Sequence, residues 1–133
     1  MMKKLQVATA VIEVGAGVAL LCCPSATVAL LLGSGLDTST GVTLGRVAGA
    51  ALLALGIACW LARGDAQSCA SRGLVSAMVL YNLGAVVILG AAGVQLRPVG
   101  VALWPAVVLH AGMTVWCIAR LLRKPSRNAE NAR

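Results

Sequence analysis

Four apolar stretches, each long enough to cross a bilayer, fill nearly all of this 133-residue chain. They run over residues 5–23, 43–62, 73–93 and 100–122. A hydrocarbon core about 30 Å thick needs roughly 20 helical residues, and each stretch is close to that length. Because the stretches are continuous and do not alternate in polarity, they are unlike barrel strands. The sequence therefore predicts an all-α fold, a four-helix transmembrane bundle in one domain over residues 1–124, with a disordered cytoplasmic tail at 125–133.

A fifth apolar segment, residues 25–32, lies between the first two stretches and is too short to cross a membrane. Pro24 is expected to end the first span, because proline is poorly tolerated inside a helix. We predict a short extra interfacial helix here, with Ser25 as a candidate N-cap. Two roles are open for this helix: a lid over the bundle, or a simple hydrophobic connector.

The composition and the distribution of charge indicate how the chain lies in its membrane. With 59% hydrophobic and 11% charged residues, the chain lacks the polar surface of a soluble domain. If the N-terminus is cytoplasmic, nine basic residues lie inside: Lys3, Lys4, Arg63, Arg72, Arg120, Arg123, Lys124, Arg127 and Arg133. Only Arg46 and Arg97 lie outside. This bias predicts a multi-pass protein of the inner (plasma) membrane with both termini cytoplasmic, and it accounts for the net charge of +7 without nucleic acid.

Three polar residues, Glu13, Asn82 and His110, fall near the middle of their spans. An ionisable group at that depth costs at least about 2.5 kcal/mol, so it normally faces the bundle interior and has a partner. Glu13 shares a helix face with small residues, which leaves room for a neighbouring helix or a water molecule. The candidate intramembrane polar cluster comprises Glu13, Arg46, Tyr81, Asn82 and His110. Glu13 pairs with either His110 or Arg46 in this hypothesis.

Two explanations for the polar cluster are open. The residues either line a path for a proton or a small solute, or they hydrogen-bond across helices and hold the packing together. The sequence contains no metal triad, no nucleophile motif and no phosphate-binding loop. We therefore expect a non-enzymatic protein with no catalytic, cofactor-binding or metal-binding residues and no cofactor. The adjacent Cys22 and Cys23 are either a redox-active pair or small apolar fillers.

Small residues recur at helical spacing in two spans. Gly45 and Gly49 are four residues apart and Gly56 continues the same region, which predicts close helix contact. Ala102 and Ala106 repeat this spacing in the last span. Such faces suit a compact bundle or a self-associating one.

The chain resembles a group of small uncharacterised bacterial membrane proteins over about residues 10–120. The resemblance is carried by the run from Arg46 to Trp60, by the pair Tyr81-Asn82, and by Leu103-Trp-Pro-Ala106 leading to His110. The architecture is also similar to that of the DoxX-like four-span families. The resemblance implies a bacterial inner-membrane four-helix protein, and it brings no activity and no site residue with it.

Two functions from different classes follow from these observations. The first is a non-enzymatic accessory or oligomeric membrane component, whose partners are the lipid bilayer and another membrane protein or a second copy. The alternative is a small proton-coupled or small-solute transporter that uses the midplane residues Glu13 and His110. Neither function involves nucleic acid.

Overall fold

The computed structural model describes residues 2–65, 68–96 and 98–122, and within these ranges the regular secondary structure is all α-helix. Its helices are α1 (Met2–Cys22), α2 (Pro24–Leu32), α3 (Ser39–Ala62), α4 (Cys69–Gln95) and α5 (Leu103–Leu122). All but α2 are long and apolar enough to cross a membrane. The prediction of an all-α four-helix bundle with one short extra helix is confirmed. The predicted tail at residues 125–133 lies outside the described residues.

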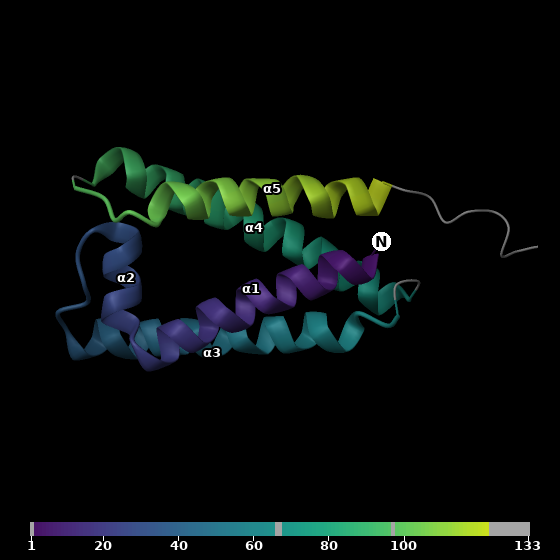
Figure 1. Ribbon diagram of the computed structural model, residues 1–133, viewed down its shortest axis with the longest axis horizontal. Helices are drawn as coiled ribbons and strands as arrows, with labels where there is room; N and C mark the ends of the chain where they lie inside the picture. Colours follow the sequence, from purple (N-terminus) through teal and green to yellow (C-terminus); the bar gives the residue numbers. More distant parts are fainter. Residues whose placement is uncertain (1, 66–67, 97, 123–133) are drawn as a thin grey trace, which may run out of the picture.

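The four long helices form two pairs, and close backbone approach occurs mostly within each pair. α1 packs along α3, and α4 packs along α5, whereas the two pairs meet mainly through a buried core of side chains that includes Leu5, Val75 and Met113. Figure 1 shows α2 lying across one end of the molecule, while the N-terminus and the end of α5 lie at the opposite end. The long helices are therefore arranged as two pairs, and α2 lies across one end of them.

Glycines in the α1–α3 contact allow the two helix backbones to approach each other closely. A Cβ atom added at Gly17 would lie 2.7 Å from the Leu53 nitrogen and 2.8 Å from the Gly49 carbonyl oxygen. A Cβ atom at Gly49 would meet the Gly17 carbonyl oxygen at 2.8 Å, and one at Gly56 would meet the Val14 nitrogen at 2.9 Å. These separations leave no space for a side chain, so the two backbones touch. The close contact predicted from the glycine spacing in this span is confirmed.

Helix α2 begins and ends at residues suited to a sharp change of direction. Pro24 occupies the first turn, where a missing N–H costs nothing, and Cys23 is the N-cap without a side-chain hydrogen bond. Gly33 ends the helix with a left-handed φ of 85°, a conformation that favours glycine. The prediction of Ser25 as the N-cap is wrong, because Cys23 takes that position and Ser25 lies in the first turn of the helix. The Ser25 hydroxyl instead accepts a hydrogen bond from the Leu36 N–H at 3.0 Å, which connects the helix to the loop that follows it.

The last carbonyl groups of α2 are bonded to the other helix pair. The Leu30 carbonyl accepts a hydrogen bond from the Ala102 N–H at 2.9 Å, and the Leu31 carbonyl accepts one from the Gly100 N–H at 3.2 Å. The final carbonyls of a helix have no partner within the helix, so these two bonds satisfy groups that need one. They also join α2 to the segment that leads into α5. The short helix therefore links the two pairs.

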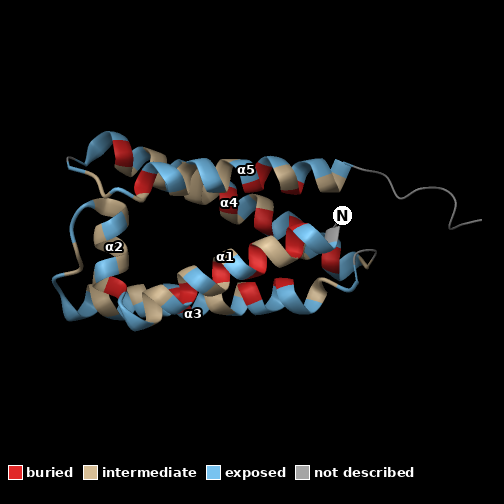
Figure 2. Cartoon of the chain, viewed as in Figure 1, coloured by how far each residue is buried: buried red, intermediate tan, exposed pale blue. Residues whose placement is uncertain are grey.

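The distribution of burial suits a lipid environment. Figure 2 shows that buried residues lie between the helices, and that much of the outer surface is exposed. That outer surface carries large apolar side chains, among them Leu80, Val101 and Leu122, each at least 75% exposed. In lipid such side chains need no further cover. Together with the four long apolar helices, this identifies a multi-pass integral membrane protein.

Candidate functional site

A cavity of about 350 Å³ lies between the two helix pairs, beneath α2. Its titratable groups are at one end, where Glu13, Tyr81 and His110 lie near the middle of the long helices. Thr27 and Leu31 of α2 close the other end. The remaining lining side chains are apolar: Ile12, Ala16, Leu20, Leu52, Ala85, Ile88, Leu89, Ala106 and Leu109. Three of the helices that supply this lining are α1, α5 and α2, and Figure 1 shows α2 lying across one end of the long helices.

Glu13 is the acidic group of this cavity, and its side chain is only 2% exposed. It lies near the middle of α1, on the face that also buries Thr9 and Gly17. Its side chain lines the cavity together with Tyr81 of α4. None of the residues that line the cavity is Lys or Arg. The carboxyl group therefore meets neutral polar groups and apolar walls, and no permanent positive charge within the described part of the chain.

His110 is held in place from behind by Asn82, which is 1% exposed. The Asn82 Nδ2 donates a hydrogen bond to the Met78 carbonyl at 2.7 Å, so its Oδ1 is the atom that faces the histidine. That oxygen lies 2.8 Å from His110 Nδ1 and can only accept, so Nδ1 must carry a proton. The ring of Tyr81 stands at 82° to the His110 ring with centroids 5.7 Å apart. The arrangement fixes the histidine orientation and leaves Nε2 without the proton in the neutral ring.

This geometry predicts which neutral tautomer of His110 is present. The chain has a single histidine, so its nitrogen NMR signals are unambiguous. We expect the Nδ1–H form to dominate in the wild-type protein, and an Asn82→Leu variant to lose this preference because the acceptor is removed. Nitrogen NMR of protein labelled at histidine, in micelles at alkaline pH, measures the ratio of the two forms. A Leu83→Ala variant on the exposed side of α4 is the control and should keep the wild-type ratio. A wild-type spectrum dominated by Nε2–H would contradict the assignment.

The structure brings together four of the five residues of the predicted cluster. Glu13, Tyr81 and His110 line one cavity, and Asn82 supports His110. Arg46 is exposed, does not line the cavity, and sits about two turns from the start of α3, far in depth from the middle of α1. Among the described residues Glu13 forms no ion pair with Arg46 and no direct hydrogen bond with His110.

Sequence reasoning missed a buried polar pair nearer the N-terminal end of α1. The Gln6 Nε2 donates a hydrogen bond to the Ser71 hydroxyl of α4 at 2.8 Å, and both residues are 2% exposed. The Gln6 Oε1 is buried without a hydrogen-bond partner in the described structure. The signal was present in the sequence, because Gln6, Thr9 and Glu13 are spaced to share one helix face. Gln6 is easily overlooked, because polar residues are ordinary at the start of an apolar span.

The Gln6–Ser71 pair makes a specific prediction about stability. Ser71→Ala leaves both polar ends of Gln6 without a partner, and we expect a loss of about 1–2 kcal/mol of unfolding free energy. In the double variant Gln6→Leu/Ser71→Ala both partners are apolar, so most of that loss should be recovered. Unfolding in mixed micelles, followed by circular dichroism, measures both values. If the double variant is as unstable as the sum of the two single variants, the hydrogen bond is not the cause.

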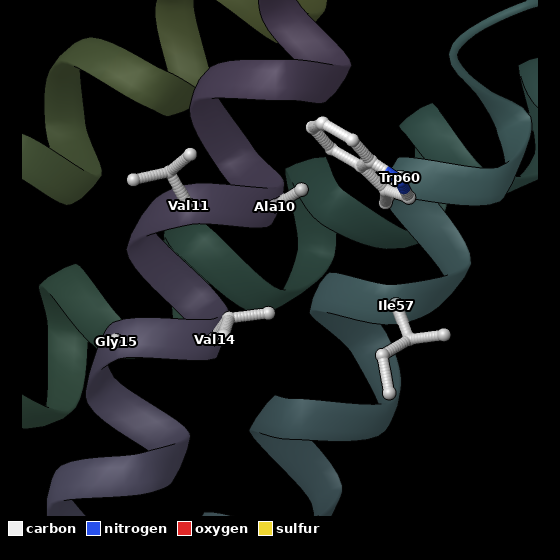
Figure 3. Close-up of a pocket in the computed structure, with 6 residues that line it drawn as sticks. All are labelled: Ala10, Val11, Val14, Gly15, Ile57 and Trp60. Carbon is white, nitrogen blue, oxygen red and sulfur yellow. The ribbon is translucent and has the colours of Figure 1, made fainter.

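A second concave region lies on the other side of α1 and differs in character. Figure 3 shows it between α1 and α3, with Val11 and Val14 on one helix and Ile57 and Trp60 on the other. Its volume is about 480 Å³ and its lining is almost wholly apolar. Gly15 has no side chain to fill this region, and nothing lies within 4 Å of where its Cβ atom would be. Such a groove suits a lipid acyl chain and offers no group for chemistry.

The described residues contain neither a metal-binding group of side chains nor a disulfide-bonded pair of cysteines. No group of three or more His, Cys, Asp or Glu side chains there is placed to hold a metal ion. All five cysteines are free, and the adjacent Cys22 and Cys23 are exposed. No protein-family model, curated protein or solved structure matches the chain. The similarity to DoxX-like proteins and the bacterial origin therefore stay predictions, and the cavity at Glu13 is the site from which function is argued.

Proposed function

We propose that this protein is a small transporter that couples the movement of a small solute to a proton on Glu13. One observation carries the proposal: the carboxyl group lies at mid-span and opens onto a cavity shared with Tyr81 and His110. Of the two functions expected from the sequence, this is the alternative one. A structural role alone would be served as well by a packed interface, and it would not require space beside the acid.

The energetics of the cavity favour a group that changes charge during a cycle. A carboxylate in apolar surroundings is costly unless a proton or another positive charge neutralises it. A proton and a solute therefore compete to neutralise or solvate Glu13, which is the basis of coupled exchange. The volume of about 350 Å³ falls within the range of small-ligand pockets.

The arrangement of the helices offers a way to open the cavity. A buried core that includes Leu5, Val75 and Met113 joins the two pairs at the end away from α2, whereas the cavity separates them nearer α2. The pairs can therefore move apart at the α2 end about this core. At the α2 end, the bonds from Gly100 and Ala102 to α2 join the pairs. Opening toward that end requires those two bonds to break, and this gives α2 the role of a lid.

The proposed orientation follows from the ends of the helices. The start of α1, the α3–α4 connection and the end of α5 lie at the end of the molecule away from α2 (Figure 1). Described basic residues gather there: Lys3, Lys4, Arg63, Arg72 and Arg120. By the positive-inside bias we propose that this end is cytoplasmic in an inner (plasma) membrane and that α2 faces outward.

The accessory or oligomeric role expected first from the sequence stays a prediction. Its test is mild extraction of the tagged protein from its own membranes, followed by quantitative mass spectrometry against a tagged unrelated four-span control. A stoichiometric protein partner would support that role. It would also move attention from the cavity to the outer helix faces.

The transport proposal is tested in proteoliposomes that contain a pH-sensitive dye. Small apolar solutes of three classes, cationic, neutral and anionic, are added outside, and we expect at least one class to drive proton movement in the wild-type protein. Ala106→Phe fills the cavity and should reduce this movement by about tenfold or more, because the solute loses its contacts. Ala119→Phe, on the exposed side of the same helix, is the matched control and should behave as wild type. If the folded wild-type protein moves protons with none of the classes, the proposal is wrong.

A further inference from the structure

We propose that the solute is a lipophilic monocation, which binds in the cavity beside Glu13 in exchange for its proton. This inference rests on the proposed transport function and names its substrate class. It is argued from the charges that face Glu13, from the cavity walls, and from the balance of the exchange step.

The groups that face Glu13 supply no permanent positive charge. α4 contributes Tyr81, α3 contributes Cys59, and α5 contributes His110, whose Nδ1–H is already bonded to Asn82. α2 contributes Thr27 and Leu31, neither of which titrates. Lys and Arg are absent from the cavity lining. An ionised Glu13 in these surroundings lacks a positively charged partner, and buried charges in proteins are normally paired.

The charge of the solute decides whether it can act as the partner that an ionised Glu13 lacks. An anion would meet the Glu13 carboxylate with no Lys or Arg in the lining to hold it. A neutral solute would leave the carboxylate unpaired in an apolar space. A cation neutralises the carboxylate directly, and it restores the charge that the departing proton removes. Of the three classes, only the cation keeps the cavity neutral in both halves of a cycle.

The walls of the cavity suit a cation with an apolar body. Apart from Glu13, Thr27, Tyr81 and His110, the lining consists of aliphatic side chains. The aromatic rings of Tyr81 and His110 lie at the same end as the carboxyl group, 5.7 Å apart between centroids. Aromatic faces attract quaternary ammonium groups, which are cations without N–H donors. The charged head is therefore expected beside Glu13, with the apolar body extending toward α2.

The exchange step balances without a further reactant. Cation binding breaks the O–H bond of the Glu13 carboxyl group, and the proton passes to water. The carboxylate then forms an ion pair with the bound cation. One positive charge enters the site for each proton that leaves, so the net charge of the site is unchanged. Because the proton and the cation compete, the apparent affinity for the cation must rise with pH until Glu13 is ionised.

The test compares benzyltrimethylammonium with neopentylbenzene, its neutral analogue in which carbon replaces nitrogen. Binding to the whole purified protein in micelles is measured by calorimetry, and proton release is measured in weakly buffered solution. We expect the cation to release about one proton per molecule bound, with affinity rising up to about tenfold per pH unit while Glu13 is protonated. Neopentylbenzene should release none. Benzyltrimethylammonium has no acidic proton, so every proton released comes from the protein.

Two acid-to-amide variants complete the test. Glu13→Gln should lose both the proton release and the pH dependence, whereas Asp65→Asn, at an exposed position after α3, should retain them. Equal binding of the cation and its neutral analogue, or unchanged proton release in Glu13→Gln, would overturn the inference. If wild-type proteoliposomes move protons with a neutral or anionic solute and the cation does not bind, the substrate class is wrong and transport stands. If no solute moves protons, both proposals fall.

Discussion

Glu13→Gln is expected to abolish solute-linked proton movement while the protein folds normally. Glutamine has nearly the same size as glutamate and keeps an oxygen that can accept a hydrogen bond from Tyr81. It has no carboxyl proton to exchange, so the coupled step cannot occur. The loss should be complete at every pH, because no other acidic side chain lines the cavity. Dye-loaded proteoliposomes measure it.

The interpretation of this variant depends on a control for folding. The helical circular dichroism and the elution profile of Glu13→Gln in micelles should match those of the wild-type protein. Asp65→Asn removes an acid of the same charge outside the spans and should leave proton movement unchanged. Proton movement that persists in Glu13→Gln would place the coupling elsewhere. Loss of folding in that variant would instead support a purely structural role for the acid.

Gly49→Leu is expected to have the largest effect on stability. A Cβ atom at this position would lie 2.8 Å from the Gly17 carbonyl oxygen and 2.9 Å from the Leu21 nitrogen. Both are backbone atoms and cannot rotate away, so α1 and α3 must separate along their contact. Leucine is favoured over glycine in helices by roughly 1 kcal/mol, but forced overpacking costs typically 1–3 kcal/mol and more where backbone must move. We therefore expect a net loss of about 2 kcal/mol or more, up to the absence of folded protein.

The matched control for this variant is Gly84→Leu in α4. Nothing lies within 4 Å of where a Cβ atom of Gly84 would be, so a side chain there enters open space. This variant should equal or slightly exceed the wild-type protein in stability, because helix propensity rises without a clash. Unfolding in mixed micelles compares the two. Similar losses at both positions would show that the added bulk itself, and not the α1–α3 backbone contact, is responsible.

The positions of the spans and the depth of the polar residues could be predicted from the sequence. Hydropathy and length are local properties, and a bilayer imposes a fixed thickness on each helix. The four spans therefore agree with α1, α3, α4 and α5 to within a few residues. Because helical rise is constant, counting along each span also placed Glu13, Asn82 and His110 near mid-span. The glycine spacing that leads to Gly49 likewise indicated a close helix contact.

The partners of those residues could not be predicted in the same way. Spacing places Gln6 and Glu13 on one face of α1, but it does not say that the face meets Ser71 and Tyr81 of α4. Opposite charge predicts a pairing of Arg46 with Glu13, yet the structure leaves Arg46 exposed. Charge alone does not bring two side chains together when their depths differ by several turns.

The sequence by itself determined a membrane protein with four spans, a short extra helix and a few polar residues at mid-depth. Only the tertiary structure decided that α1 pairs with α3, that α2 bonds to the segment before α5, and that space remains beside Glu13. The physical reason is the range of the forces involved. Transfer into lipid acts on each segment independently, whereas helix pairing depends on steric fit between faces distant in sequence, and a cavity is what that fit leaves unfilled.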